Sequence, residues 1–291
     1  MTTAYGNARS GQQGMALVVV LWVVVLLSII AAAHASNVHA TTRLTARQLE
    51  FAQLKASAGS GVQRAILELL AQRGEGPWPI NGQVRTVSIM DRDVSIAVRS
   101  ATGLIDINSA TPQLLAALFD ATSADKDTKA ALVDAVLDWR DADDLTRLQG
   151  AEADAYGGAH GDWTIRNGAF VSVDELRYVR GMTNQLFQEI APFITIHSGF
   201  AGVDFEYAPV ALIQALTGQP VQTANDVVPA GQPATSRQVS RSGTFHIYAE
   251  ASSATARAAL EAVVRIEPTA DVPFTVLQWR ETGRSLPARA R

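Results

Sequence analysis

The organisation of the chain is decided by the stretch Gly14-Met15-Ala-Leu-Val-Val-Val-Leu-Trp-Val-Val-Val-Leu-Leu-Ser-Ile-Ile-Ala-Ala-Ala33. It follows a polar leader whose one charged residue is Arg9, and no charged residue occurs between Gly14 and Arg43. As a helix that rises ~1.5 Å per residue, a run of about nineteen residues spans roughly 28 Å, close to the hydrocarbon thickness of a bilayer. We therefore expect a transmembrane helix here.

The residues of this segment leave three interpretations open. A secretory signal peptide would be cut after Ala33-His34-Ala35, although its apolar region is longer than such signals need. A plain membrane anchor would be kept whole, with Arg9 on the cytoplasmic side. A class III (prepilin) leader, residues 1–14, would be cut between Gly14 and Met15, so that the apolar run survives.

The residues after the apolar run favour the prepilin interpretation. Apolar side chains recur at helical spacing from Leu44 to Leu70, with charged side chains between them. We therefore expect one long helix over 15–73, with a kink at Gly59-Ser60-Gly61 and an end at Gly74-Glu-Gly-Pro77. A helix that is apolar all round in its first half and amphipathic in its second is typical of pilin-like subunits.

Val19 stands where pilin-like subunits usually have Glu, at the fifth position after the cut. A carboxylate in an apolar bundle is costly unless it is paired, and in pilins its partner is the N-terminal ammonium of a neighbouring subunit. A subunit with Val19 cannot form that pair. It is therefore unsuited to repeat along a filament, but it could begin or cap one.

The composition excludes several classes of function. The chain has 291 residues, 47% of them hydrophobic, a formal net charge of -4 and no cysteine. Thiolate metal sites, thiol catalysis and a disulfide framework are therefore excluded, and nothing in the charge suggests a nucleic-acid partner. The histidines are scattered, and no catalytic spacing or phosphate loop occurs, so we expect no enzyme.

The pattern of the remaining chain predicts an α+β fold. Residues 84–90 and 94–98 are expected to form a β-hairpin joined by Asp91-Arg92-Asp93, and strands return at 243–249, 260–266 and 274–279. Helix signals dominate between them: Thr111-Pro112 predicts the start of one helix, and the capping box Ser172-Val-Asp-Glu175 predicts the start of another. We expect a pilin-like antiparallel sheet (78–102 plus 240–281) on which the long helix packs, a large all-α insertion with a polar linker (103–239), and a tail (282–291).

Several motifs resemble one known family, the minor pseudopilin K (general secretion pathway protein K) family of the type II secretion system. Besides the Gly14/Met15 junction and the missing Glu, they are Gly103-Leu-Ile-Asp-Ile-Asn-Ser-Ala-Thr-Pro112, Leu137-Asp-Trp-Arg-Asp-Ala-Asp143, Gly150-Ala-Glu152 with Tyr156, and Asp174-Glu-Leu-Arg-Tyr-Val-Arg-Gly-Met182. They occur in the family's order over nearly the whole chain. The stretch Val203-Asp-Phe-Glu-Tyr-Ala208 departs from the family's pattern.

This resemblance implies a role in protein secretion. It implies a substrate of prepilin peptidase, held in the inner membrane by one helix, with its head in the periplasm of a Gram-negative bacterium. It also implies a place at the tip of the pseudopilus, in complex with minor pseudopilins I and J and above the major pseudopilin, where the complex helps to start assembly.

The densest carboxylate cluster is Asp141, Asp143 and Asp144, with Glu152 and Asp154 downstream. Calcium prefers several oxygen ligands, often from a loop rich in Asp. The spacing of Asp141, Asp143 and Glu152 fits positions one, three and twelve of an EF-hand, but Leu145 and Thr146 stand where an oxygen ligand and Gly are needed. The loop is therefore not an EF-hand. The family resemblance implies that the helical insert can bind calcium; the alternative is a solvated acidic loop.

Two segments also resemble helix-hairpin-helix DNA-binding modules, namely Ile107-Asn-Ser-Ala110 and Val179-Arg-Gly-Met182. In such modules backbone N–H groups bind phosphate. Residues 101–199, however, contain fifteen Asp and Glu against seven Lys and Arg, which would repel a phosphate backbone. We therefore expect no nucleic-acid partner. A membrane-anchored DNA-binding protein of the periplasm is kept as the alternative function.

Overall fold

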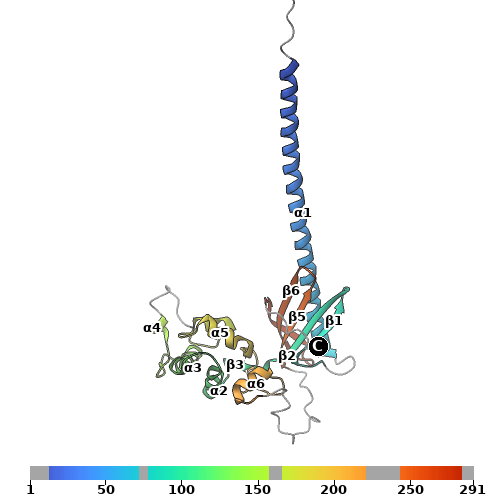
Figure 1. Ribbon diagram of the computed structural model, residues 1–291. Helices are drawn as coiled ribbons and strands as arrows, with labels where there is room; N and C mark the ends of the chain where they lie inside the picture. Colours follow the sequence, from blue (N-terminus) through green and yellow to red (C-terminus); the bar gives the residue numbers. More distant parts are fainter. Residues whose placement is uncertain (1–12, 72–77, 157–165, 221–242, 284–291) are drawn as a thin grey trace, which may run out of the picture. The chain divides into compact units, whose positions relative to one another are not determined.

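A computed structural model describes residues 13–71, 78–156, 166–220 and 243–283, with the side chains of 13–16 and 32–41 left out. Most of the predicted leader, of the polar linker and of the tail thus lies outside the described residues. The chain divides into two compact units, residues 1–53 and 54–291, which are described separately. Helix α1 (Gln13–Ala71) begins in the first unit and ends in the second (Figure 1).

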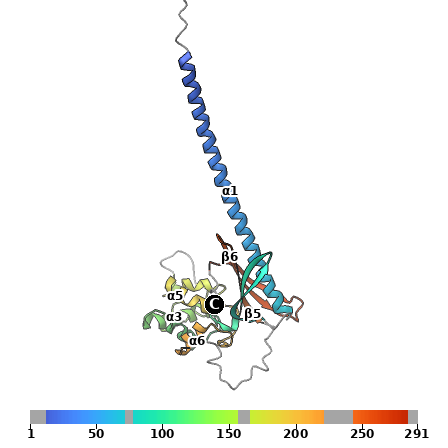
Figure 2. The same cartoon turned by 45° about the vertical axis from the view of Figure 1, so that its right-hand side comes forward.

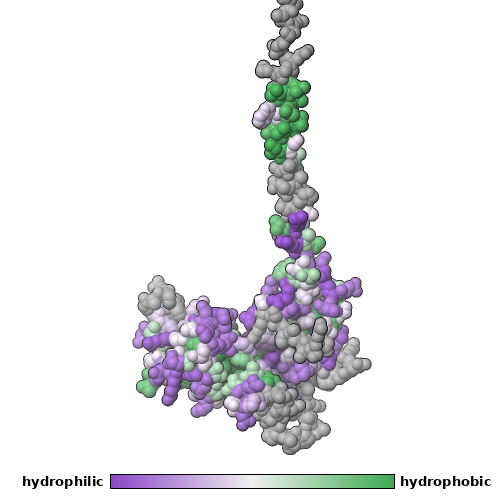
Figure 3. All heavy atoms as spheres, viewed as in Figure 1, coloured by the Kyte–Doolittle hydropathy of each residue, from purple (hydrophilic) through white to green (hydrophobic). Residues whose placement is uncertain are grey.

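The described residues of the first unit all belong to α1. Its apolar side chains from Leu17 to Ile30 are exposed, and Figure 3 shows them as a band around the helix. In the part of the chain that the structure describes, no helix combines the length and the apolar character needed to cross a membrane. The predicted segment Met15–Ala33 extends at both ends into side chains that are not described.

The second unit is built on a five-stranded antiparallel sheet with the strand order β1-β2-β5-β6-β7 (Figure 1). The strands are β1 (Asn81–Ile89), β2 (Arg92–Ser100), β5 (Gly243–Ser252), β6 (Arg257–Ile266) and β7 (Phe274–Glu281). The sheet, with helices packed beside it, confirms the predicted α+β class.

The end of α1 packs on one face of this sheet. Apolar side chains of the helix and of alternate strand positions form a buried core, whose helical members are Leu54, Ala58, Val62, Ala65 and Ile66. Helix α1 is continuous through Gly59 and Gly61, the segment at which we expected a kink. A Cβ on Gly61 would lie 2.8 Å from Cγ1 of Val94, so this glycine lets the helix approach the sheet closely.

The hairpin of β1 and β2 turns one residue earlier than the sequence predicted. Ile89 pairs with Arg92, so the loop is Met90-Asp91 and not Asp91-Arg92-Asp93. Both loop residues have positive φ, 50° and 57°. Two-residue loops of this kind match the right-handed twist of the strands, which explains why the register closes here although neither residue is Gly or Asn.

The insertion leaves the sheet after β2 and returns at β5, and these two strands are hydrogen-bonded neighbours. Its α-helices are α2 (Pro112–Asp120), α3 (Lys126–Arg140), α4 (Ala153–Tyr156), α5 (Asn184–Ile190) and α6 (Val210–Thr217). Figure 2 shows α3, α5 and α6 grouped together. They enclose a second apolar core that includes Leu115, Leu132, Phe187 and Leu212.

Besides helices and loops, the described part of the insertion contains one short parallel strand pair, β3 (Ile105–Asp106) with β4 (Ile194–Thr195). It also contains the 3-10 helices η1 (Ala101–Gly103), η2 (Val173–Tyr178) and η3 (Ala191–Phe193). The helix expected after Ser172 is thus a 3-10 turn of six residues. Ser172 does cap it, because its Oγ accepts a hydrogen bond from the N–H of Asp174.

Candidate functional site: an acidic loop in the helical insert

Helix α3 places the first carboxylates of the acidic loop. The carboxylate of Asp125 accepts hydrogen bonds from the N–H groups of Asp127 and Thr128 at its start, and Asp141 is its C-cap. Asp134, Asp138 and Asp141 follow one another at spacings of four and three, so they share one face of the helix. The last turn of α3 therefore presents carboxylates to the loop that follows.

Arg147 lies between two of these carboxylates. Its Nη1 is 3.3 Å from Oδ1 of Asp138 and 3.3 Å from Oδ2 of Asp141. Its backbone N–H also donates to Oδ2 of Asp138, over 3.1 Å. A Cβ on Gly150 would lie 1.9 Å from that same Oδ2, so only glycine lets the loop pass this close to Asp138.

Glu152 is the least satisfied acid of the site. Glu152 is 3% exposed, and neither carboxylate oxygen has a hydrogen-bond partner among the residues that the structure describes. Burial raises the pKa of Glu152, and the charges of Asp138, Asp141, Asp144 and Asp143 raise this pKa further. Buried polar atoms are normally paired, so two unpaired carboxylate oxygens on one side chain are unusual.

Two more buried oxygens in this region also have no partner, Oδ1 of Asp141 and Oδ1 of Asn167. Asn167 donates a hydrogen bond of 2.7 Å from Nδ2 to Oδ1 of Asp144, which attaches it to the loop. Burial raises the pKa of Asp141, against the opposing charge of Arg147. Together with Glu152, the site has four oxygen atoms that are buried and unpaired.

The predicted residues are thus brought together only in part. Oδ1 of Asp143 is used locally and accepts a hydrogen bond from the N–H of Leu145. Asp154 lies exposed in the first turn of α4. The sequence prediction missed Asp138, Arg147 and Asn167. The acidic face of α3 could have revealed Asp138, whereas Asn167 is brought in by a distant return of the chain.

The donor chemistry of this site fits calcium, which binds carboxylate and amide oxygens. The arrangement is not preassembled, however. Among the residues that the structure describes, no group of three or more His, Asp or Glu side chains is placed so that it could hold a metal ion. Asp138 and Asp141 are turned toward the guanidinium of Arg147 instead.

A second polar cluster joins the insert to the sheet. Oγ1 of Thr195 is 3.1 Å from Nε2 of His246, and Nδ1 of His246 is 3.5 Å from Oε1 of Glu261. Arg280 contacts Oε2 of Glu261 at 2.6 Å and Oδ2 of Asp174 at 3.7 Å. His246 also lies near enough to His197 to contribute to the lowering of the pKa of His197, so these two histidines, far apart in the sequence, are close in the fold.

This cluster has the order hydroxyl, imidazole, carboxylate that hydrolases use. Thr195 is fully buried, at 0% exposure, so a substrate cannot reach its hydroxyl. Burial would raise the pKa of Glu261, but hydrogen bonds from His246 and Tyr248 and the charge of Arg280 lower it to about 2. The cluster is therefore an ionised contact between the insert and the sheet.

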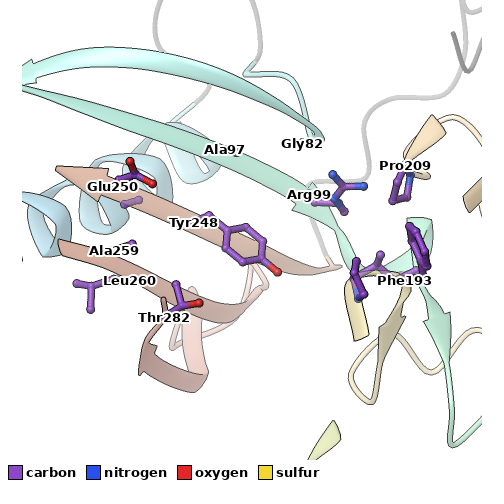
Figure 4. Close-up of a pocket in the computed structure, with 13 residues that line it drawn as sticks. Gly82, Ala97, Arg99, Phe193, Pro209, Tyr248, Glu250, Ala259, Leu260 and Thr282 are labelled. Atoms are coloured by element: carbon purple, nitrogen blue, oxygen red, sulfur yellow. The ribbon is translucent and has the colours of Figure 1, made fainter. Parts of the chain in front are cut away.

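A pocket of about 180 Å³ also lies between the sheet and the insert (Figure 4). Arg99, Tyr248 and Glu250 line it from the strands, and Phe193 and Pro209 line it from the insert. Gly82, with φ of 86°, makes room for Arg99, because a Cβ there would lie 2.2 Å from its Nη2.

The comparisons with known proteins identify the region that contains the acidic loop. Residues 94–199 match the family model described as type II secretion system (T2SS), protein K. Residues 94–199 are a type II secretion system protein K domain. The resemblance inferred from the motifs is thereby confirmed. The domain contains β2, both short strands and the helices from α2 to α5, so the acidic loop belongs to it.

Relatives support the same family. Type II secretion system protein K of Pectobacterium carotovorum subsp. carotovorum is 27% identical over 207 residues, which is 64% of this chain. The match spans 63% of that relative's length. One chain of the crystal structure of the GspK-GspI-GspJ complex from enterotoxigenic Escherichia coli shares the fold, with a TM-score of 0.59 and 17% identity over 82% of this chain and 99% of that one.

The protein K domain uses its hairpin-like segments internally. The N–H of Asn108 donates to Oδ1 of Asp106, and those of Ser109 and Ala110 donate to its backbone carbonyl. The N–H of Arg180 donates to the hydroxyl of Tyr156. In a DNA-binding module these N–H groups would have to bind phosphate. Because they donate to groups within the protein instead, the geometry argues against DNA binding, the alternative function.

The remaining predicted sites lie in the first unit. Gly14 and Met15 are part of α1, and nothing is described of their side chains. Val19 is 60% exposed on the same helix. Cleavage after Gly14 and the significance of Val19 therefore stay predictions.

Proposed function

We propose that the chain is a minor pseudopilin of the type II secretion system that lies at the tip of the pseudopilus and helps to start its assembly. The observation that carries the proposal is the helical insertion between two neighbouring strands of the sheet, much of which lies in the protein K domain. A helical insertion of this size is difficult to accommodate within a regular filament of repeating subunits. At the tip it is limited to one copy.

Val19, near the N-terminus, also supports a position at the tip of the pseudopilus. It leaves the first unit without a carboxylate in its apolar stretch, so this subunit cannot offer the ion pair that repeating subunits make. The apolar residues of α1 would anchor the protein in the inner membrane, with the second unit in the periplasm. Prepilin peptidase would remove the leader.

The proposed partners are minor pseudopilins I and J, with the major pseudopilin below them. The shared fold with a chain of the GspK-GspI-GspJ complex supports this choice. The test is co-expression of the full chain with both minor pseudopilins in membranes, followed by detergent extraction and affinity purification through this chain. We expect a stoichiometric ternary complex. Recovery of this chain without either partner would contradict the proposal.

We also propose that the acidic loop binds calcium, because Glu152 is buried with two unpaired oxygens beside other carboxylates. Asp141, Asp143, Asp144, Glu152 and Asn167 would supply the oxygen ligands, while exposed Asp154 would contribute charge. The bound ion would neutralise the loop and hold it to α3.

Calorimetric titration of the full chain with calcium tests this site. We expect binding, and we expect Glu152→Gln to weaken it at least about tenfold. Glu175→Gln is the matched control, since Glu175 pairs with Arg166 in the same insert and carries the same charge. Equal affinity in both variants would exclude Glu152 as a ligand.

A further inference from the structure

The dipeptide Asn-Gly occurs twice in the chain, as Asn81-Gly82 in the sheet and as Asn167-Gly168 in the insert. Asparagine is chemically labile when glycine follows it, because the glycine nitrogen has no Cβ beside it and can attack the side-chain amide. Asn167 has φ of 44°, in the left-handed region that asparagine tolerates better than most residues. The second pair therefore combines a reactive sequence with an uncommon backbone conformation.

The fold holds both nitrogens that deamidation would use. Nδ2 of Asn167, the leaving group, donates to Oδ1 of Asp144 over 2.7 Å and to the carbonyl of Asp143 over 3.4 Å. The N–H of Gly168, the nucleophile, donates to the carbonyl of Trp139 over 3.1 Å. The side-chain amide is thus attached to the acidic loop and the backbone nitrogen to α3. The amide must leave Asp144 before its carbon can turn toward that nitrogen.

Deamidation would reverse the character of this contact. Nδ2 of Asn167 is a donor that lies 2.7 Å from an acidic oxygen, whereas an aspartate would bring a second carboxylate oxygen to that place. Oδ1 of Asn167 is also buried, and it has no hydrogen-bond partner among the residues that the structure describes. Two like charges in contact repel each other, and burial strengthens the repulsion. The product would therefore separate from Asp144.

We propose that Asn167 is a deamidation site which the acidic loop holds back, and that its deamidation releases the loop from residues 166–170. The nitrogen of Gly168 bonds to Cγ of Asn167, the Cγ–Nδ2 bond breaks, and ammonia leaves with the proton of the attacking nitrogen. Water then opens the cyclic imide at either carbonyl, which gives aspartate or isoaspartate. The reaction consumes water and releases ammonia, and it requires no oxidant or reductant.

The experiment follows deamidation of the full chain at constant pH by peptide mass spectrometry that separates aspartate from isoaspartate. Asp144→Ala removes the acceptor of Asn167. We expect deamidation at Asn167 to become about tenfold faster, because a hydrogen bond to a charged acceptor no longer holds the amide. Asp144→Asn keeps an acceptor oxygen and should give an intermediate rate. Asn81-Gly82 is the internal reference, and its rate should be equal in all variants.

Two further variants are controls for charge and for chemistry. Asp154→Ala removes the same charge from an exposed position and should leave the rate at Asn167 unchanged. Gly168→Ala, combined with Asp144→Ala, should slow the reaction by hindering the attacking nitrogen. The fold has room for this alanine, since its Cβ would lie no closer than 3.8 Å to Arg166. Equal rates at Asn167 in the wild type and in Asp144→Ala would overturn the restraint by the loop. A product without isoaspartate would overturn the cyclic route.

The release of the loop has its own measurement. Asn167→Asp reproduces one product of the reaction, and we expect amide hydrogen exchange of residues 141–150 to be about tenfold faster in this variant than in the wild type. Asn167→Ser removes the amide without adding a charge and should have a smaller effect. Exchange in Asn167→Asp as slow as in the wild type would overturn the release.

Discussion

Glu261 is a buried carboxylate on strand β6. It is 4% exposed and ionised, and its negative charge is balanced by Arg280 and by contact with His246. Loss of one partner from a buried pair costs about 3–5 kcal/mol, and less when the other partner is half exposed, as Arg280 is. We predict that Glu261→Gln lowers the free energy of unfolding by about 2–3 kcal/mol at pH 7, measured by urea denaturation.

The pH dependence provides a second measurement for Glu261. Its pKa is lowered from 4.5 to about 2 in the folded protein, so its stabilisation is complete above pH 4.5 and is lost as the pH falls toward 2. The Gln variant should lack this part of the acid slope. Glu175→Gln, which weakens a pair whose other member, Arg166, is about half exposed, should cost less than about 1 kcal/mol. Equal losses in the two variants would contradict the assignment.

His197 is expected to make folding stability depend on pH nearer to neutrality. Burial lowers its pKa, and His246 lowers it further, while Asp106 and Gln278 oppose this and Arg265 adds to it. The folded protein therefore binds the proton less readily than the unfolded chain, and stability present above pH 6.5 is lost as the pH falls below it. We predict that His197→Asn makes stability less dependent on pH between 7 and 5.5. An unchanged slope in thermal melts would refute this.

The sequence could not reveal these residues because they converge through the fold. Thr195 and His246 are 51 positions apart, and the strand that carries each belongs to a different sheet. The acidic loop was easier to predict, since Asp141, Asp143 and Glu152 are close in the chain. Even there, the sequence did not single out Arg147, because only the fold places it between two carboxylates.

At the scale of elements, two glycines of α1 allow a matched comparison. A Cβ on Gly61 would lie 2.8 Å from Val94 and 3.2 Å from Ala249, whereas a Cβ on Gly59 would lie 3.8 Å from Leu260 and Trp279. Alanine stabilises an open helical position by about 0.5–1 kcal/mol relative to glycine. We predict that Gly59→Ala stabilises by that amount.

At Gly61 the steric contact opposes the gain in helix propensity. We predict that Gly61→Ala destabilises by about 1–2 kcal/mol, because the helix must move away from β2 and β5. Urea denaturation of the two variants under one condition measures both effects. Stabilisation by both substitutions would show that α1 can move away from the sheet at little cost.

The spacing of apolar residues predicted which helices and strands form better than it predicted where they begin and end. The apolar alternation located all five strands of the sheet, and Thr111 and Pro112 marked the start of α2 as expected. The turn at Met90-Asp91 was missed because its positive φ values fall on residues that rarely adopt them. The 3-10 form of Val173–Tyr178 was missed because a capping box does not distinguish it from an α-helix.

For the whole molecule, the sequence predicted a sheet interrupted by a helical insertion, since strand patterns end near residue 100 and return after residue 242. It could not predict that the insertion contacts the sheet through an ionised cluster. That contact depends on Asp174 and Thr195 meeting Arg280 and His246, which only the folded insert brings near. Different sequence patterns predict the two units: a continuous apolar run predicts the helix of the first, and alternating apolar and polar residues predict the strands of the second.

The processing of the N-terminus decides whether the mature protein keeps the apolar part of α1. If residues 1–14 are a prepilin leader, the mature chain begins at Met15 and keeps every apolar residue of α1. We predict that intact-mass analysis of the membrane-extracted protein shows loss of these residues, and that Gly14→Glu leaves the precursor uncut, because the peptidase would need a small residue before the cut. Gly11→Glu, in the same leader, should still be processed. A mature chain that begins at Ser36 would mean that a signal peptidase removes the apolar run, and the membrane-anchored pseudopilin proposed here would then be wrong.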